Sequence, residues 1–218
     1  MRGVLDEDPP WAMQLAVRAE KAAPPGHRAV CAATAMAVVA LLTDPRAADP
    51  EGEWYPYVSR WENARIRKVV RRARGVRWPE VQKLPGVTVS HAGSEVRAFV
   101  PGPVDQVPPE LAKLQVAGLD LEDEGPLPAP EPPYAAIALN PGVTMTTGKA
   151  AAQSGHAAQL LLRQAPASRV VDWLGAGAVV QVADVPWRSC VERAMVAVRD
   201  AGFTEVPPGT MTAIGWIV

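Results

Sequence analysis

The sequence predicts an α/β protein built as a tandem pair of small units, and three observations lead to this fold class. Strand-like and helix-like segments alternate along the chain, and the order of segments in the first half recurs in the second. A Pro- and acid-rich stretch at residues 122–132 separates the halves as a linker. With 218 residues, of which 48% are hydrophobic, the chain can form two small domains. We expect them at residues 11–121 and 133–218.

The first half is expected to contain strands and one long buried helix. Residues 11–18 and 66–73 have the pattern of strands. The longest apolar run, residues 29–42, contains Thr34 and is too short for a membrane span, so we interpret it as a buried helix. Residues 1–10 are acidic and lack the apolar core of a signal peptide. No membrane partner is therefore expected.

The second half is expected to begin with a strand at residues 134–139, followed by a helix. The helix begins at Gly148 or Lys149, and Thr146 or Thr147 can cap it, since a threonine hydroxyl accepts from an unpaired backbone N–H.

The C-terminal segments are expected to be a helix, a turn and a last strand. Residues 187–199 are predicted to be helical, with Gly202 available for a left-handed cap beyond Asp200. Residues 207–209 form a turn, and residues 211–218 have the pattern of a short terminal strand.

One face of the helix after residue 148 carries three polar side chains. Lys149, Gln153 and His156 are spaced i, i+4 and i+7, which places them on the same side of a helix. Lys149 lies in the first turn, where the helix macrodipole disfavours a cation, so binding an anion beside the free N–H groups is a role that explains it. The alternative is a surface lysine, a surface glutamine and a histidine at the edge of the core.

Three further polar residues follow the expected C-terminal helix. Asp200 lies at its end, Thr204 just beyond it, and Thr212 opens the last strand. By themselves these residues are also typical of ordinary turns, because Asp and Thr side chains bond to nearby backbone groups.

Together the two segments resemble the type 2 peptidyl-tRNA hydrolases. Members of that family carry a Gly-Lys-x-Ala-Ala-Gln-x-x-His-Ala run on their first helix, and residues 148–157 are similar to it. They also carry an Asp-Ala-Gly-x-Thr turn and a Pro-Gly-Thr/Ser-x-Thr run, which match residues 200–204 and 208–212. The chain departs from the family at residues 140–143, where an Arg-x-Asp-Leu run is usual, and at Phe203, where arginine is frequent.

The resemblance implies that each half is a small mixed β-sheet flanked by helices. Family members commonly pair as homodimers, so a fused tandem is expected to be a pseudo-dimer and therefore a monomer. The resemblance also implies tRNA as partner and the ester of peptidyl-tRNA as substrate. No metal or other cofactor is expected, since no cluster of metal-ligand residues is visible.

The first half resembles a second copy of the family without its polar site. Arg28 pairs with Lys149, Trp61 with Trp173, and residues 91–93 with residues 200–202. In this pairing the positions of the family's glutamine, histidine and aspartate hold Ala32, Ala35 and His91.

Basic charge is concentrated in the first half. The whole chain has a net charge of −1, but residues 11–121 hold fifteen basic and eleven acidic side chains, whereas residues 130–218 hold six of each. Because phosphate contacts dominate nucleic-acid affinity, this half is the candidate tRNA-binding surface. The alternative is a solvated surface segment. The candidate RNA-binding residues are Arg65, Arg67, Lys68, Arg71 and Arg72.

The resemblance and the residue types lead to a hypothesis of ester hydrolysis. Asp200 orients or deprotonates a water, and Lys149 stabilises the oxyanion or holds a phosphate. Thr204 and Thr212 position the water and ribose hydroxyls, with Gln153 and His156 in support. The alternative is a non-catalytic RNA- or protein-binding member of the same fold. Two distant cysteines favour no disulfide, so a cytoplasmic location is expected.

Overall fold

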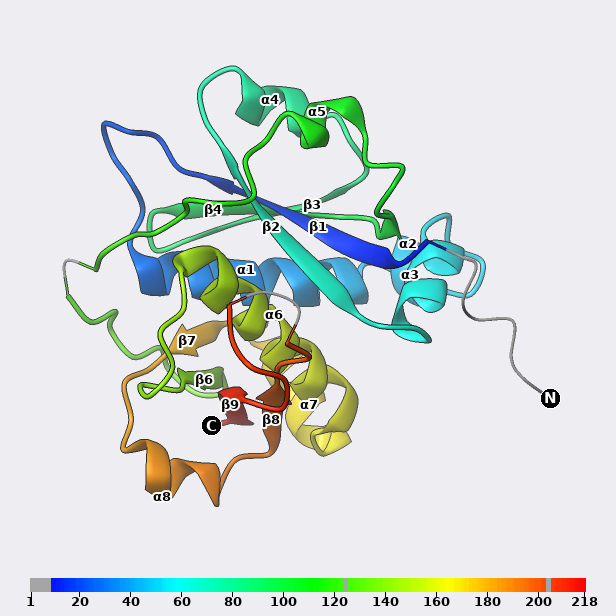
Figure 1. Ribbon diagram of the computed structural model, residues 1–218. Coiled ribbons are helices and arrows are strands. Elements are labelled where there is room, and N and C mark those ends of the chain that lie inside the picture. Colours follow the sequence, from blue (N-terminus) through cyan, green and yellow to red (C-terminus); the bar gives the residue numbers. More distant parts are fainter. Residues whose placement is uncertain (1–8, 124, 203–204) are drawn as a thin grey trace.

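The computed structural model describes residues 9–123, 125–202 and 205–218, and they form two β-sheets with helices between and around them (Figure 1). The first half contains β1 (Trp11–Arg18), α1 (His27–Thr43), α2 (Pro45–Ala48), α3 (Tyr55–Glu62), β2 (Arg67–Ala73), α4 (Arg77–Val81), β3 (Gly86–His91), β4 (Ser94–Phe99), β5 (Gly102–Pro103) and α5 (Pro109–Ala112). The second half contains β6 (Ala135–Leu139), α6 (Thr147–Gln164), α7 (Ala167–Gly175), β7 (Val180–Val182), α8 (Trp187–Val191), β8 (Val196–Arg199) and β9 (Met211–Ile217).

The two sheets have the same strand order and directions. The first sheet is ordered β2-β1-β4-β3, with β5 added beside β1, and the second is ordered β7-β6-β9-β8. In each, the first strand of the half pairs in parallel with the second and antiparallel with the fourth. The third strand of each half pairs antiparallel with the fourth. Both sheets are therefore mixed, and the coarse α/β prediction is confirmed.

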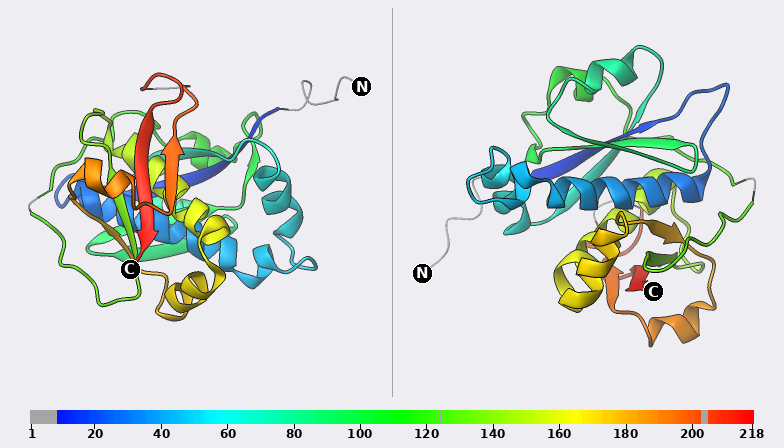
Figure 2. Two further views of the ribbon diagram at one scale, coloured as in Figure 1. Left: turned by 90° about the horizontal axis from the view of Figure 1, so that it is seen from below. Right: turned by 180° about the vertical axis from the view of Figure 1, so that it is seen from behind.

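Helices α1 and α6 pack against each other between the two sheets, and Figure 2 shows α1 lying across the first sheet. Both helices are rich in alanine, which allows close approach, and one hydrophobic core extends across both halves. A smaller core lies between the outer face of the first sheet and helices α4 and α5. The helix pair therefore forms the centre of the molecule.

Helix ends and tryptophans mark equivalent places in the two halves. Helix α1 ends at the C-cap residue Asp44 and α6 at Ala165, and a proline follows each. The C-caps are separated by 121 positions (44 to 165), as are Arg28 and Lys149 (28 to 149). Trp61 and Trp173 are fully buried.

Each of these tryptophans donates its indole N–H to a carbonyl six residues later. The acceptor of Trp61 is Arg67, at 3.0 Å, and that of Trp173 is Val179, at 2.8 Å. Arg67 is the first residue of β2 and Val179 immediately precedes β7, so the residue after each acceptor, Lys68 in β2 and Val180 in β7, occupies an equivalent position.

The expected helix at residues 187–199 is wrong in its second part. Helix α8 ends at Val191, and Val196–Arg199 forms strand β8. Along β8, Val196 and Val198 are buried whereas Ala197 and Arg199 are exposed, which is the period of two of a strand with one face in the core. Asp200 therefore follows a strand. The last strand, expected at residues 211–218, is confirmed as β9.

The start of the expected linker packs on the first half. The carbonyl of Glu122 accepts from the N–H of His27 at 3.3 Å, and Asp123 accepts from the N–H of Arg28 at 2.8 Å. This segment therefore covers the N-terminal end of α1. Both cysteines are free thiols, and no helix within the described ranges is long and apolar enough to cross a membrane.

Candidate functional site

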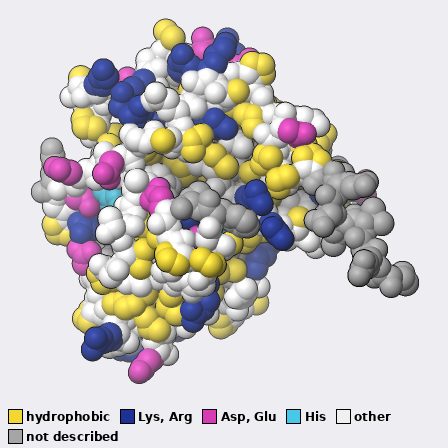
Figure 3. Space-filling view, in the orientation of Figure 1, with side chains coloured by type: hydrophobic (Ala, Val, Ile, Leu, Met, Phe, Trp, Pro, Cys, Tyr) yellow, Lys and Arg dark blue, Asp and Glu magenta, His cyan; other side chains and the backbone are white. Residues whose placement is uncertain are grey.

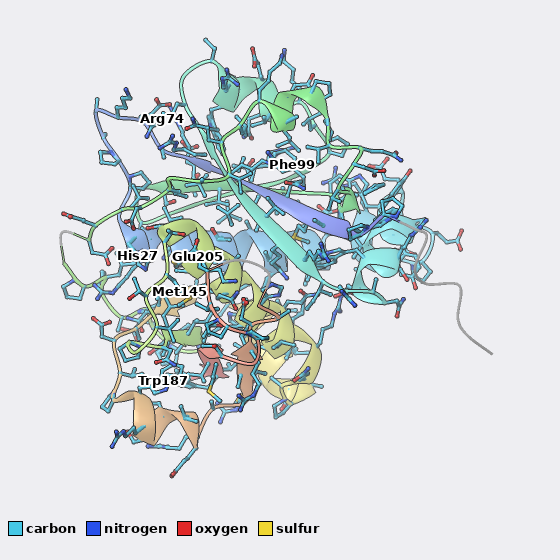
Figure 4. All side chains as sticks on the ribbon, in the orientation of Figure 1. His27, Arg74, Phe99, Met145, Trp187 and Glu205 are labelled. Atoms are coloured by element: carbon cyan, nitrogen blue, oxygen red, sulfur yellow. The ribbon has the colours of Figure 1, made fainter. Side chains whose placement is uncertain are left out.

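Helix α6 begins at a cap that combines a threonine and a glutamate. Thr146 adopts an extended conformation as N-cap, and its hydroxyl accepts from the N–H of Lys149 at 3.3 Å, as predicted for one of the two threonines. The Glu205 carboxylate accepts from the N–H of Thr146 at 2.9 Å and from its hydroxyl at 2.7 Å. A carboxylate is favoured at this end of the helix dipole. Figure 4 shows Glu205 beside Met145 at the start of α6.

The first half contacts the next residues of the helix. The hydroxyl of Thr147 accepts from the N–H of Leu121 at 2.9 Å and lies 2.9 Å from Nδ1 of His27. The N–H of Gly148 donates to the carbonyl of Leu119 at 3.2 Å. The N-terminal turn of α6 is thus held from both halves of the chain.

Lys149 and Asp200 form an ion pair. The Lys149 ammonium bonds to Oδ2 of Asp200, and the side chains are 10% and 7% exposed. Gln153 donates to the same Oδ2 at 2.9 Å, while the N–H of Gly202 donates to Oδ1 at 2.8 Å. The backbone of Asp200 also bonds to the loop that returns to β9. The Asp200 carboxylate is therefore fixed by donors from α6 and from its own loop.

Thr212 supports this pair from beneath. It is fully buried, and its hydroxyl donates to Oε1 of Gln153 at 2.6 Å. That bond leaves the amide N–H of Gln153 directed at Asp200, so the order of donation is Thr212 to Gln153 to Asp200. Thr204 lies outside the described residues. The structure thus brings together four of the predicted site residues, and their catalytic role stays a prediction.

His156 faces the first half of the chain. Its Nδ1 lies 3.2 Å from the ammonium of Lys68, and the same ammonium donates to Oε1 of Gln159 at 2.5 Å. Burial lowers the pKa of His156 well below its ordinary value, and the charges of Lys68 and Lys149 lower it further. Burial also lowers the pKa of Lys68 to about 7, against a smaller opposing effect of Glu62.

The basic residues predicted to bind RNA lie in different environments. Arg65 is exposed and Arg67 is partly buried. Arg71 donates to Oε1 of Gln14 at 2.8 Å, and burial lowers its pKa. Arg72 donates to the carbonyl of Gly118 at 2.9 Å. In Figure 3 basic side chains on this face lie over the end formed by α4 and α5 and at mid-height, and others lie over the lower half.

A groove of about 430 Å³ lies where both halves meet, beside the carboxyl ends of the parallel strands β6 and β7. Arg28 pairs there with Asp184 and with Asp123, the latter at 3.4 Å. Ala150 lies on its wall, one residue after Lys149. The lining residues are His27, Arg28, Asp123, Leu139, Asn140, Pro141, Val143, Met145, Ala150, Val182, Ala183, Asp184 and Val185.

Several of these contacts are not visible in the sequence motifs. The partnership of Lys68 with His156 joins residues 88 positions apart, and Glu205 caps α6 across 59 positions. The equivalence of Trp61 and Trp173 is the sequence signal that could have placed Lys68 near the helix pair.

Comparison with protein-family models and with curated proteins identifies no relative. The chain matches no protein-family model, and no curated protein matches it. Among the described residues, no three His, Cys, Asp or Glu side chains are grouped to hold a metal ion. The assignment of a function therefore depends on the geometry of the site and on the motifs in the sequence.

Proposed function

We propose that this chain hydrolyses the ester bond of peptidyl-tRNA at the site in its second half. One observation carries the proposal: Lys149, Gln153, Asp200 and Thr212, from three separate segments, are joined in one hydrogen-bonded chain. These are the residues to which the resemblance with type 2 peptidyl-tRNA hydrolases assigns the chemistry.

In the proposed reaction Asp200 orients a water and accepts its proton as the water attacks the ester carbonyl. The ammonium of Lys149 stabilises the negative charge that develops on the carbonyl oxygen. Gln153 holds the carboxylate of Asp200, and buried Thr212 fixes the orientation of Gln153. Thr204 is the remaining threonine, and the proposal assigns it the water or a ribose hydroxyl.

The first half is proposed to bind the tRNA and to replace the second subunit of a homodimer. Its positive charge, with exposed Arg65 and partly buried Arg67, supports phosphate binding. The shared strand order and the packing of α1 on α6 support a duplicated, pseudo-dimeric chain. Because the equivalent surfaces then cover each other, we propose a monomer, located in the cytoplasm with its substrate.

One observation favours a non-catalytic RNA- or protein-binding role as the second candidate. Lys149 and Asp200 neutralise each other with little exposure, which is also how an ion pair that only stabilises the loop after β8 is arranged. Activity then depends on whether the substrate separates the pair.

The test is release of free tRNA from purified peptidyl-tRNA by the full-length chain. Lys149→Met and Asp200→Asn should each lower the rate about a hundredfold or more, which is typical of losing an oxyanion donor or a general base. Asp172→Asn changes an exposed aspartate of α7 and serves as the matched control. No release by the unaltered chain, with tRNA binding retained, would favour the binding role.

A further inference from the structure

Lys68 is a first-half residue whose charged end lies among residues of the second half. Its ammonium contacts His156 at 3.2 Å and Gln159 at 2.5 Å, both on α6. It also lies 4.8 Å from the centre of the Trp61 ring, within range of a cation–π contact. Lys68 therefore connects strand β2 with the helix that carries Lys149.

The approach of Lys68 to α6 depends on a glycine. A Cβ at Gly155 would lie 3.2 Å from Cδ of Lys68 and 3.1 Å from Cγ2 of Val38. Because Gly155 has no side chain, the aliphatic part of Lys68 can cross the surface of α6 there. The Lys68 ammonium then contacts His156, the residue after Gly155.

Glu62 extends the same set of contacts. Its carboxylate accepts from Nε2 of Gln159 at 3.0 Å and from Arg163 at 3.0 Å and 2.7 Å. Two first-half residues, Glu62 and Lys68, therefore hold three consecutive turns of α6 at His156, Gln159 and Arg163.

The equivalent place on the other side of the helix pair is apolar. A separation of 121 positions, set by the helix C-caps, relates His156, Gln159 and Arg163 to Ala35, Val38 and Leu42. The tryptophans relate Lys68 to Val180 and Glu62 to Leu174. All five counterparts belong to or pack against the hydrophobic core: Ala35, Val38, Leu42, Leu174 and Val180.

This asymmetry argues that the polar contacts do more than hold the halves together. An apolar set closes the equivalent contact without burying a charge, and burying an ammonium costs free energy that its partners only partly return. The polar contacts, made by His156, Gln159 and Arg163, lie on α6, the helix that carries Lys149 and Gln153 and contacts Asp200. Their apolar counterparts lie on α1, which has no such residues.

We propose that Lys68 is a positioning residue, supplied by the first half, for the site in the second half. This role rests on the proposed hydrolase function. Lys68 fixes the orientation of the His156 ring and the rotation of α6 about its axis, and thereby the positions of Lys149 and Gln153. Lys149, Gln153 and His156 share one face of α6, so a rotation that moves one of them moves all three.

The chemistry of the contact makes this proposal testable. A protonated amine has donors only, so Nδ1 of His156 must accept and the ring proton must lie on Nε2. The lowered pKa of His156 agrees with a ring that stays neutral beside two ammonium groups. Glu62, Arg163 and Lys149 are the other charged groups from α3 and α6 around the pair.

The first measurement is the tautomer of His156 by ¹⁵N NMR of the full-length chain, with the signal assigned by His156→Gln among three histidines. The unaltered chain should show a bare Nδ1 and a protonated Nε2 at pH 6, below the pKa of about 7 at which Lys68 loses its proton. Lys68→Met should give a mixture of tautomers, whereas Lys83→Met, an exposed control from the same half, should not. An unchanged His156 spectrum in Lys68→Met would overturn the proposal.

A second variant separates positioning from folding. Lys68→Val combined with Gln159→Val copies the apolar pair Val180 and Val38 of the equivalent place, and it leaves His156 intact. It should fold, with a Tm close to that of the unaltered chain, yet lose kcat about tenfold to a hundredfold with KM changed less than about threefold. Full kcat in this variant would mean that Lys68 has only a structural role.

The outcomes distinguish this proposal from the proposed function. An inactive unaltered chain whose His156 responds to Lys68→Met refutes the hydrolase function, while the placement of His156 by Lys68 stands. An active chain in which both variants leave kcat and His156 unchanged refutes the positioning role alone.

Discussion

The buried ammonium of Lys68 predicts an unusual dependence of stability on pH. Its pKa is about 7 in the folded chain and 10.5 for an ordinary lysine. Between these values the unfolded state binds a proton that the folded state does not, so the free energy of unfolding rises with pH. The lowered pKa costs no stability above pH 10.5, and its cost to the folded state grows as the pH falls towards 7, where Lys68 becomes protonated in the folded chain too.

The size of the effect follows from the linkage relation. One proton of difference is worth about 1.4 kcal/mol per pH unit, so from pH 7 to pH 9 the free energy of unfolding gains about 2 kcal/mol. The side chain of Lys68 is only partly buried, so solvent screening lowers the expected gain in the free energy of unfolding to between about 1 and 2 kcal/mol. Lys68→Met removes the titrating group and should flatten the dependence by this amount.

Urea unfolding at pH 7, 8 and 9 measures the effect in the unaltered chain and in Lys68→Met, with Lys83→Met as the exposed control. Burial raises the pKa of Cys31 to about 12, which lowers stability near pH 9, but this contribution is common to all three chains and cancels. A gap between the unaltered chain and Lys68→Met that stays constant from pH 7 to pH 9 would refute a lowered pKa for Lys68.

Three further predictions concern close approaches and charge. Gly202→Ala should lower the free energy of unfolding by about 1–3 kcal/mol and abolish tRNA release, because φ at Gly202 is +80° and a Cβ there would lie 2.7 Å from Pro208. Gly209→Ala is the control, since Gly209 has a φ of +81° but open space around it and therefore shares only the backbone strain. Equal effects of the two changes on tRNA release would contradict this prediction. Gly155→Ala should raise the Tm less than Gly175→Ala does, because overpacking at Val38 offsets the helix propensity that alanine gains at both positions, and equal rises would contradict this. Replacing Arg65 and Arg67 with Ala should weaken tRNA binding and flatten its salt dependence in titrations, and unchanged affinity would mean a solvated edge.

Local patterns in the sequence were sufficient for much of the fold. The capped start of α6, the strands expected at residues 11–18, 66–73, 134–139 and 211–218, and the pairing of Trp61 with Trp173 are signals carried by a few neighbouring residues. The shared strand order then agrees with a repeat inferred from the order of these signals. Strand β8 was missed because Ala and Val in Val196–Arg199 fit a buried helix as well as a strand.

The site was predictable only as far as its residues lie in motifs. Lys149, Gln153, Asp200 and Thr212 were identified, but their connection through Gln153 is a matter of side-chain geometry across 47 and 59 positions. Lys68 was assigned to an RNA-binding run because sequence shows its charge and not its direction. On strand β2 the alternation sends Lys68 towards α6 and Arg71 towards Leu114 on the opposite side.

The two halves differ most where a symmetric pair would be identical, and this difference has a physical reason. In a symmetric dimer each site needs the same neighbouring surface, so a charge kept for one site is kept at both. A fused chain removes that constraint, and each copy of the contact can change separately. The apolar set around Ala35 and Val180 is the arrangement expected once only packing matters there. The polar set around His156 and Lys68 keeps a buried ammonium that packing alone disfavours, and it does so on the helix where Lys149 and Asp200 meet. Under the proposed duplication, the apolar contact in one place and the polar contact in the other are two results of the same release from symmetry.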